Sequence, residues 1–369
     1  MLGPKPQGRA AMAMTPYVLE PGDAIPNFAL PDVIGQATSP VIHSRGKPIV
    51  LVFCDRDYDV NLRPFAAAAD ALKVVDLFIV TRLAPAENAA LAQRVVLPWG
   101  VLADTAGDTT AFYAFCGADR PRPALTTYVL DIGLRVRRVD RGGPARDHVE
   151  GVLSGAREIL DPGAAFSVPR SAPVLWIPRV MSRDQCRELT EWWRSKGNEA
   201  SGTIDNRANA EIDAYAQTAK RRRDHEIVDP ALNANLADLF RRRIVPEVAK
   251  AYQFLATRTT GFKIAAYLDQ HSTGGYFRAH RDNISPISAH RRFAVSLFLN
   301  DASEYDGGML RFPEYGPETY RASAGEALVF SCSVLHEVTD VTRGTRFMLL
   351  TFLSNEAAAR NARGPTFSL

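Results

Sequence analysis

Cysteine is scarce in this chain, which has four cysteines among 369 residues. They stand at positions 54, 116, 186 and 332, so no two of them form a CxxC pair. A chain of this length can bury an ordinary hydrophobic core and does not need a disulfide framework. We therefore interpret the cysteines as reduced thiols of a cytoplasmic protein.

Long apolar runs are also missing, because no stretch of the sequence approaches the length needed to span a bilayer. The segment 1–16 contains Lys5 and Arg9 but only a broken apolar patch at 10–14. It lacks the apolar centre of a signal peptide, so we expect a disordered leader there. No membrane association is predicted.

An excess of charge of either sign is absent as well. Lysine and arginine number 44 and aspartate and glutamate 41, so the formal net charge is 44 − 41 = +3. This excess is too small to predict nucleic-acid binding by the whole chain. Two basic runs, 220–223 and 241–243, are expected to be solvated faces, and Asp224 and Glu226 favour local pairing of the first. The alternative is an anionic substrate or nucleic acid near the mouth of an active site.

The first half of the chain alternates between strand and helix patterns. Residues 47–54 form a continuous run of β-formers, which suits a strand buried on both faces. A helix is predicted over 62–75 and a strand over 74–80. Two further strands, 126–130 and 134–139, flank a turn. This alternation predicts a small α/β domain.

A change of composition separates the halves. Residues 161–173 are rich in Pro, Ser, Gly and Ala, and we expect the domain boundary there. Ser182, followed by Gln185, has the spacing of a helix N-cap with a capping box. A second helix is predicted over 231–254, with a kink or break at Pro246.

From residue 262 onward the pattern is one of short β-rich segments punctuated by Gly and Pro. This pattern is typical of a sandwich or barrel. The segments are 262–268, 293–299, 309–312, 327–332 and 346–353. The polar stretch 201–216, which has no periodicity, is expected to form a loop that faces the substrate.

The residues that carry chemistry in this half are His280, Asp282 and His336. Residues i and i+2 of a strand point to the same face, so His280 and Asp282 can bind one metal. A histidine from a distant strand completes a set of two histidines and one carboxylate on one face of an octahedron. Such a set leaves three positions open and suits Fe(II), whereas catalytic zinc leaves one. Arg346, which begins a predicted apolar strand, would need an anionic partner such as a carboxylate.

Four ordered sequence blocks resemble the prolyl 4-hydroxylase type of Fe(II)/2-oxoglutarate-dependent oxygenase. They are GYFRAHRDN at 275–283, FLN at 298–300, GGMLRF at 307–312 and HEVTDVTRGTR at 336–346. The resemblance implies that residues 174–358 form a double-stranded β-helix, or jelly roll, with flanking helices. It also implies metal ligation by His280, Asp282 and His336, and 2-oxoglutarate held at its far end by Arg346. Tyr267 is similar in position to a tyrosine that touches the co-substrate.

The function implied by this resemblance is that of a dioxygenase that hydroxylates a peptide, a protein side chain or an amino-acid-like small molecule. Succinate and CO₂ would be released, with Fe(II), 2-oxoglutarate, O₂ and ascorbate as cofactors or co-substrates. Phe298 stands where some members of the family carry a tyrosine, which puts one contact to the co-substrate in doubt. Nucleic acid is not expected as a partner.

The first half, residues 17–160, resembles a peroxiredoxin or thioredoxin-like domain. The resemblance rests on residues 21–30 and on the strands at 47–54 and 123–130. A peroxiredoxin carries a reactive cysteine just after the central strand, but segment 55–62 has no cysteine and contains three aspartates that disfavour a thiolate. Cys54 is expected to be a buried core thiol, and the domain a module without a peroxidatic cysteine. Two alternatives stay open: a thiol-dependent peroxidase in this half, and a platform that docks partners or forms a homodimer.

Overall fold

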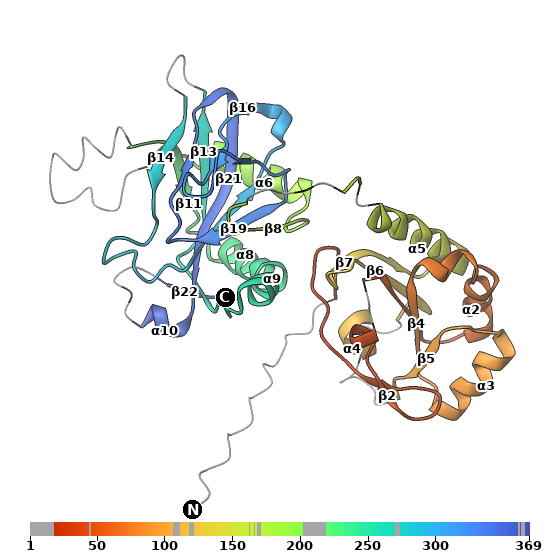
Figure 1. Cartoon of the computed structure of the whole chain (residues 1–369). Coiled ribbons are helices and arrows are strands. Elements are labelled where there is room, and N and C mark those ends of the chain that lie inside the picture. Colours follow the sequence, from red (N-terminus) through yellow and green to blue (C-terminus); the bar gives the residue numbers. More distant parts are fainter. Residues whose placement is uncertain are drawn as a thin grey trace, which may run out of the picture. The chain divides into compact units, whose positions relative to one another are not determined.

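The computed structural model describes residues 18–43, 46–105, 111–117, 122–161, 163–165, 167, 171–201, 219–269, 274–360, 362 and 366–369. The chain forms two compact units, residues 1–164 and 165–369 (Figure 1). The division lies inside the segment rich in Pro, Ser, Gly and Ala. The leader predicted over 1–16 and the loop predicted over 201–216 lie outside the described residues, apart from Ser201.

A five-stranded sheet forms the centre of the first unit, with the strand order β5-β4-β3-β6-β7. Strands β3, β4 and β5 are mutually parallel, whereas β6 and β7 run antiparallel to their neighbours. The bounds are β3 Ile49–Cys54, β4 Asp76–Thr81, β5 Gly100–Ala103, β6 Leu125–Leu130 and β7 Val136–Arg141. Every side chain of β3 is buried, as its continuous apolar run predicts. The expected thioredoxin-like α/β arrangement is therefore confirmed.

Two hydrophobic cores fill the two faces of this sheet, one under the long helices and one under the short helix α4. The remaining elements of the unit are β1 Leu30–Pro31, β2 Ala37–Thr38, α1 Pro40–His43, α2 Tyr58–Ala67, the 3₁₀ helix η1 Ala71–Val74, α3 Pro85–Val95, α4 Ala111–Cys116 and α5 Ala145–Leu160.

Two predictions of element bounds in this unit were wrong. The helix predicted over 62–75 begins at Tyr58 and ends at Ala67, and a separate 3₁₀ turn follows it. The strand predicted from residue 134 begins at Val136, because Leu134 has a positive φ of 65° and belongs to the preceding turn. An alanine-rich or apolar run in the sequence does not show at which residue a turn ends a helix or precedes a strand.

The second unit is built from antiparallel sheets (Figure 1). The larger sheet has the order β8-β19-β15-β21-β13-β11-β9, with β12, β16 and β22 attached beside it. The smaller sheet has the order β10-β14-β20-β17-β18. An inner core contains residues of both sheets, among them Tyr267 and Phe298 of the larger and Leu310 and Val338 of the smaller. The jelly roll predicted for this half is confirmed.

The strands of this unit are mostly short. Their bounds are β8 Val174–Ile177, β9 Glu199–Ala200, β10 Lys220–Arg221, β11 Arg223–Glu226, β12 Arg258–Thr259, β13 Lys263–Leu268, β14 Tyr276–His280, β15 Phe293–Phe298, β16 Tyr305–Gly307, β17 Leu310–Arg311, β18 Thr319–Tyr320, β19 Ala327–Ser331, β20 His336–Val338, β21 Val341–Ser354 and β22 Phe367–Ser368.

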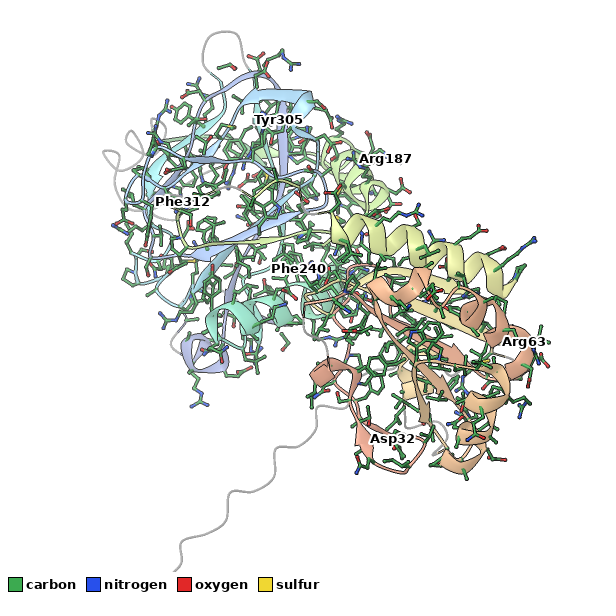
Figure 2. The ribbon with its side chains drawn as sticks, turned by 45° about the vertical axis from the view of Figure 1, so that its right-hand side comes forward. Asp32, Arg63, Arg187, Phe240, Tyr305 and Phe312 are labelled. Atoms are coloured by element: carbon green, nitrogen blue, oxygen red, sulfur yellow. The ribbon has the colours of Figure 1, made fainter. Side chains whose placement is uncertain are left out.

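Helices cover one face of the larger sheet and share an outer core with it. They are α6 Arg183–Ser195, α8 Pro230–Arg243 and α9 Val245–Tyr252, and the 3₁₀ helix η2 Ala302–Glu304 and α10 Glu356–Ala359 complete the unit. Phe240 of α8 is fully buried in this core, while Arg187 lies on the exposed side of α6 (Figure 2). None of the described helices is long and apolar enough to cross a membrane.

The predicted helix signals of this half were confirmed. The Ser182 hydroxyl accepts a hydrogen bond from the backbone N–H of Gln185, and the Gln185 side chain accepts one from the N–H of Ser182. The helix predicted over 231–254 is interrupted between α8 and α9, at Ile244, two residues before Pro246. A proline lacks the N–H that would continue the first helix, which explains the break.

Candidate functional site

His280 and His336 meet across two neighbouring strands of the smaller sheet. His280 is the last residue of β14 and His336 the first of β20, and the two are direct cross-strand partners. Their ring centroids are 4.2 Å apart. The pairing of β14 with β20 therefore brings together two side chains that are far apart in the sequence.

Asp282 completes this cluster from the turn that follows β14. Its Oδ1 lies 3.4 Å from Nε2 of His280 and its Oδ2 3.3 Å from Nε2 of His336. We expected Asp282 to lie on the strand itself, but β14 ends at His280. The Asp282 N–H instead donates to the carbonyl oxygen of Cys332, at 2.9 Å, and this bond holds the turn in place.

Hydrogen bonds fix the orientation of both imidazole rings. Nδ1 of His280 lies 2.8 Å from the carbonyl oxygen of Arg278, and Nδ1 of His336 lies 3.0 Å from that of Val334. A carbonyl only accepts, so each Nδ1 carries the proton and each Nε2 presents a lone pair. One ligand atom from each of His280, Asp282 and His336 lies within 4.8 Å of the others, which is a spacing that can hold a metal ion.

The electrostatics of the cluster favour a neutral imidazole beside an ionised carboxylate. Burial lowers the pKa of His336, against the opposing effect of Asp282. Burial opposes the charged form of Asp282, but His336 and His280 together outweigh it and hold the pKa of this carboxyl below its usual value. Both protonation states are those that metal ligation requires.

Arg346 is buried inside the unit without a carboxylate partner among the described residues. It lies within β21 opposite Tyr267 of β13, and its exposed fraction is 2%. Its guanidinium carbon is 5.0 Å from the ring centre of Tyr267 and 5.1 Å from that of Phe298. The Nε atom is buried and has no hydrogen-bond partner. A buried cation in this state creates a strong demand for an anion.

Tyr267 lies next to Arg346 on the neighbouring strand, and its hydroxyl already has a polar partner. Its side chain is 2% exposed, and its hydroxyl accepts a hydrogen bond from Nη1 of Arg222 at 3.1 Å. Arg222 is in turn paired with Asp224, with Nε to Oδ1 at 2.6 Å. Phe298, where a tyrosine was considered, contributes only its ring to Arg346.

One cavity of about 310 Å³ joins these side chains. The three clustered residues, Arg346 and Tyr267 all line it. Apolar side chains such as Phe277, Phe330 and Leu350 make up much of the remaining wall. The structure therefore brings together every site residue named from the sequence.

The cavity also contains residues that were not named from the sequence as site residues. Lys220 and Arg222 line it, so the expectation that the run 220–223 is merely a solvated face was wrong for these two. Lys220 belongs to β10, which pairs with β14 and thereby reaches the cavity wall. Arg291 was not singled out either, and it also lines the cavity. For Lys220 and Arg222 the signal in the sequence was the density of positive charge in the run 220–223, whose alternative interpretation placed it near the mouth of an active site.

The thiols of the first unit are poorly suited to chemistry. Cys54 is fully buried, as expected, and burial raises its pKa to about 12. Burial likewise raises the pKa of Cys116 to about 12. A reactive cysteine needs the opposite shift, because the thiolate is the nucleophile.

Comparison with known proteins gives matches to both halves. Residues 262–354 match the family described as the 2OG-Fe(II) oxygenase superfamily. A PKHD-type hydroxylase from Hyphomonas neptunium is 27% identical over 205 residues, which cover 53% of this chain and 84% of that protein. A PKHD-type hydroxylase from Paraburkholderia xenovorans is 27% identical over 180 residues, which cover 47% of this chain and 74% of that protein.

Among solved structures, a prolyl-4-hydroxylase from Pseudomonas putida is 18% identical, with a TM-score of 0.36. The match covers 50% of this chain and 94% of that chain. The peroxidoxin BcpB from Mycobacterium tuberculosis is 21% identical, with a TM-score of 0.35. The match covers 38% of this chain and 98% of that chain.

Proposed function

We propose that the C-terminal half of this chain is a 2OG-Fe(II) oxygenase domain, which makes the chain a 2-oxoglutarate-dependent hydroxylase. His280, Asp282 and His336 bind Fe(II), and Arg346 binds the distal carboxylate of 2-oxoglutarate, with Tyr267 beside it. The substrate is a peptide, a protein side chain or an amino-acid-like small molecule.

The observation that carries this proposal is that a cluster of potential metal ligands and a buried arginine line one cavity. Two imidazole Nε2 atoms and a carboxylate face one another at metal-ligand spacing, and the buried Nε of Arg346 has no partner. The donor set fits Fe(II), since two histidines and one carboxylate leave positions open for O₂ and a bidentate co-substrate. The buried guanidinium of Arg346, whose Nε has no partner, fits a dicarboxylate whose other end reaches the metal.

When bound at these residues, Fe(II) and 2-oxoglutarate would supply O₂ activation coupled to oxidative decarboxylation, which gives succinate and CO₂. The chain contributes binding, orientation and a dry cavity. The carbonyl oxygens of Arg278 and Val334 keep Nε2 of each histidine free of a proton. Arg346 orients the co-substrate by a charge-assisted pair, and the apolar wall around it excludes water and strengthens that pair.

The test is spectroscopic and needs no substrate. The purified protein is loaded with Fe(II) without oxygen, 2-oxoglutarate is added, and the visible metal-to-ligand charge-transfer band is recorded. We expect a band that is lost with Asp282→Ala. Arg346→Ala should need on the order of 10-fold to 100-fold more 2-oxoglutarate, because a buried charge-assisted bidentate pair is lost.

Arg343→Ala is the matched control, since Arg343 is an exposed arginine of the same strand that pairs with Asp306. The Arg343→Ala variant should need the same concentration of 2-oxoglutarate as the unaltered protein to form the band. Absence of the band from the metal-loaded protein, or its persistence in Asp282→Ala, would show that this cluster is not the iron site.

For the first unit we propose a non-catalytic role, as a module that docks a partner or a second copy of the chain. The raised pKa of Cys54 and Cys116 supports this role over that of a thiol peroxidase. Ascorbate as a reductant is proposed on the resemblance to prolyl 4-hydroxylases. A cytoplasmic location is proposed because the four cysteines are free thiols, which suits a reducing compartment.

A further inference from the structure

Arg222 lies at the point where the chain passes from the smaller sheet of the second unit to the larger one. The strand before it, β10, pairs with β14, and the strand after it, β11, pairs with β13. The side chain of Arg222 lines the cavity together with Tyr267, and only 8% of it is exposed. A guanidinium in such a place needs fixed partners, because a buried charge without them is costly.

Asp224 holds this guanidinium by a forked pair of hydrogen bonds. Nε of Arg222 donates to Oδ1 of Asp224 at 2.6 Å, and Nη2 donates to Oδ2 at 2.7 Å. The Ser201 hydroxyl also donates to Oδ2, at 2.6 Å. Burial opposes the ionised form of Asp224, but Arg222 outweighs it, so the pKa of this carboxyl lies below its usual value. The pair is therefore charged on both sides, and the fork fixes the plane of the guanidinium.

The remaining side of the guanidinium faces the hydroxyl of Tyr267. Nη1 of Arg222 donates to this hydroxyl at 3.1 Å. Because an arginine can only donate, the hydroxyl oxygen must accept here, and its own proton points away from Arg222. Among the described residues, none accepts that proton. The Tyr267 hydroxyl is thus left as a donor with a fixed direction and no acceptor within the described part of the chain.

Arg346 lies directly beside this tyrosine. The two residues are cross-strand partners, and the guanidinium carbon of Arg346 is 5.0 Å from the ring centre of Tyr267. Phe298 lies at 5.1 Å from the same guanidinium carbon but has no hydroxyl, so of these two aromatic residues only Tyr267 can donate. A carboxylate paired with Arg346 is the acceptor that suits it, because hydrogen bonds to an ionised acceptor are the stronger ones.

We propose that Arg222 and Asp224 are positioning residues of the co-substrate site, which orient the Tyr267 hydroxyl so that it donates to the distal carboxylate of 2-oxoglutarate. The inference rests on the proposed function and extends its co-substrate site to a pair of residues that acts through Tyr267. Without Arg222 the hydroxyl proton can lie on either side of the ring. A donor that is already oriented loses less freedom when the ligand binds.

The experiment uses the full chain loaded with Fe(II) without oxygen, and the charge-transfer band reports the binding of two 2-oxo acids. 2-Oxoglutarate carries the distal carboxylate, whereas 2-oxopentanoate has a methyl group in its place and keeps the chelating end. Tyr267→Phe removes the donor. Arg222→Met combined with Asp224→Asn removes the pair, since either change alone would leave a buried charge without its partner.

Two further variants complete the set. Arg222→Lys keeps the charge, but a lysine cannot fork to Asp224 and reach Tyr267 at once, so this variant decides the question if the double variant does not fold. Arg223→Met is the matched control, since the neighbouring Arg223 directs its Nη2 to the carbonyl oxygen of Asn198, at 2.7 Å, and does not line the cavity.

We expect Tyr267→Phe to raise the dissociation constant of 2-oxoglutarate on the order of 10-fold, because a hydrogen bond to a charged group is lost. The double variant and Arg222→Lys should each raise it roughly threefold or more, and neither should add to the effect of Tyr267→Phe, because both act through the same hydroxyl. The dissociation constant of 2-oxopentanoate should change less than about twofold in every variant, since it has no distal carboxylate. Arg223→Met should leave both constants unchanged.

Equal rises for the two 2-oxo acids would overturn the positioning role, because a general structural effect acts on both ligands. A rise that is as large in the Tyr267→Phe background, or an unchanged 2-oxoglutarate constant without Arg222, would overturn it as well. These results leave the proposed iron site intact, since the band is present. Absence of the band from the unaltered protein instead strikes the proposed iron site, and this inference with it.

Discussion

The side chain of Arg346 lies against the backbone of Gly308, and this contact shows how closely single residues shape the site. A Cβ atom at position 308 would lie 2.9 Å from Cδ of Arg346 and 2.8 Å from Cγ2 of Val341. Gly308 also has a φ of 58°. Only glycine satisfies both the close approach and the backbone conformation without strain.

Gly308→Ala should therefore weaken 2-oxoglutarate binding, because the added methyl group displaces Arg346 from its position. We expect the dissociation constant, measured from the charge-transfer band, to rise on the order of 10-fold, in line with about 1–3 kcal/mol for overpacking. Gly197→Ala is the control, since Gly197 has a φ of 87° but nothing within 4 Å of the added atom. Equal effects of both variants on 2-oxoglutarate binding would show that backbone strain alone is responsible.

The individual residues of the candidate site were largely predictable from the sequence, and its cationic wall was not. His280, Asp282, His336 and Arg346 stand in ordered blocks that resemble those of a known oxygenase family. Lys220 belongs to a two-residue strand whose partner in β14 is more than fifty positions away, and no local periodicity marks such a pairing. A run of four basic residues also gives no sign of which side chains turn inward.

The N-terminal boundary of helix α6 was specified well by the sequence. It begins after Ser182, whose hydroxyl satisfies an N–H of the first turn, and its buried face contacts the larger sheet. Trp193 of this face packs edge-on against Phe347, with ring centroids 5.3 Å apart, next to Arg346. For helix α2, which has no side-chain cap at Asp57, the predicted start was instead four residues too late and the predicted end eight residues too late.

Ser182→Ala should destabilise the protein by about 1 kcal/mol, because the N–H of Gln185 loses its acceptor. For a unit of this size that corresponds to a fall of roughly 2–4 °C in the Tm of the second unit, measured by calorimetry. Ser195→Ala at the other end of α6 is the matched control, since its exposed hydroxyl makes only a 3.4 Å contact to the carbonyl of Trp192. A fall as large for Ser195→Ala would contradict the capping explanation.

The two units of the molecule differ in the chemical groups that they make available for a reaction. In the first unit, Cys54 at the end of β3 and Cys116 at the end of α4 both have raised pKa values, because burial disfavours the thiolate. The second contains every residue that lines the described cavity, from Ala219 to Phe352. The alternation of strands and helices predicted the architecture of the first unit, and the short punctuated strands that of the second, because each pattern reflects which faces are buried.

This division predicts that residues 165–369 fold alone and keep the proposed iron site. Expressed separately and loaded with Fe(II), they should show the charge-transfer band with a 2-oxoglutarate dissociation constant within about twofold of that of the full chain, since every described lining residue is present. The oligomeric state of both proteins is measured in parallel by light scattering. A dimer that becomes a monomer on truncation would support a platform role for the first unit. Loss of the band in a folded fragment would instead show that the first unit is needed to complete the site.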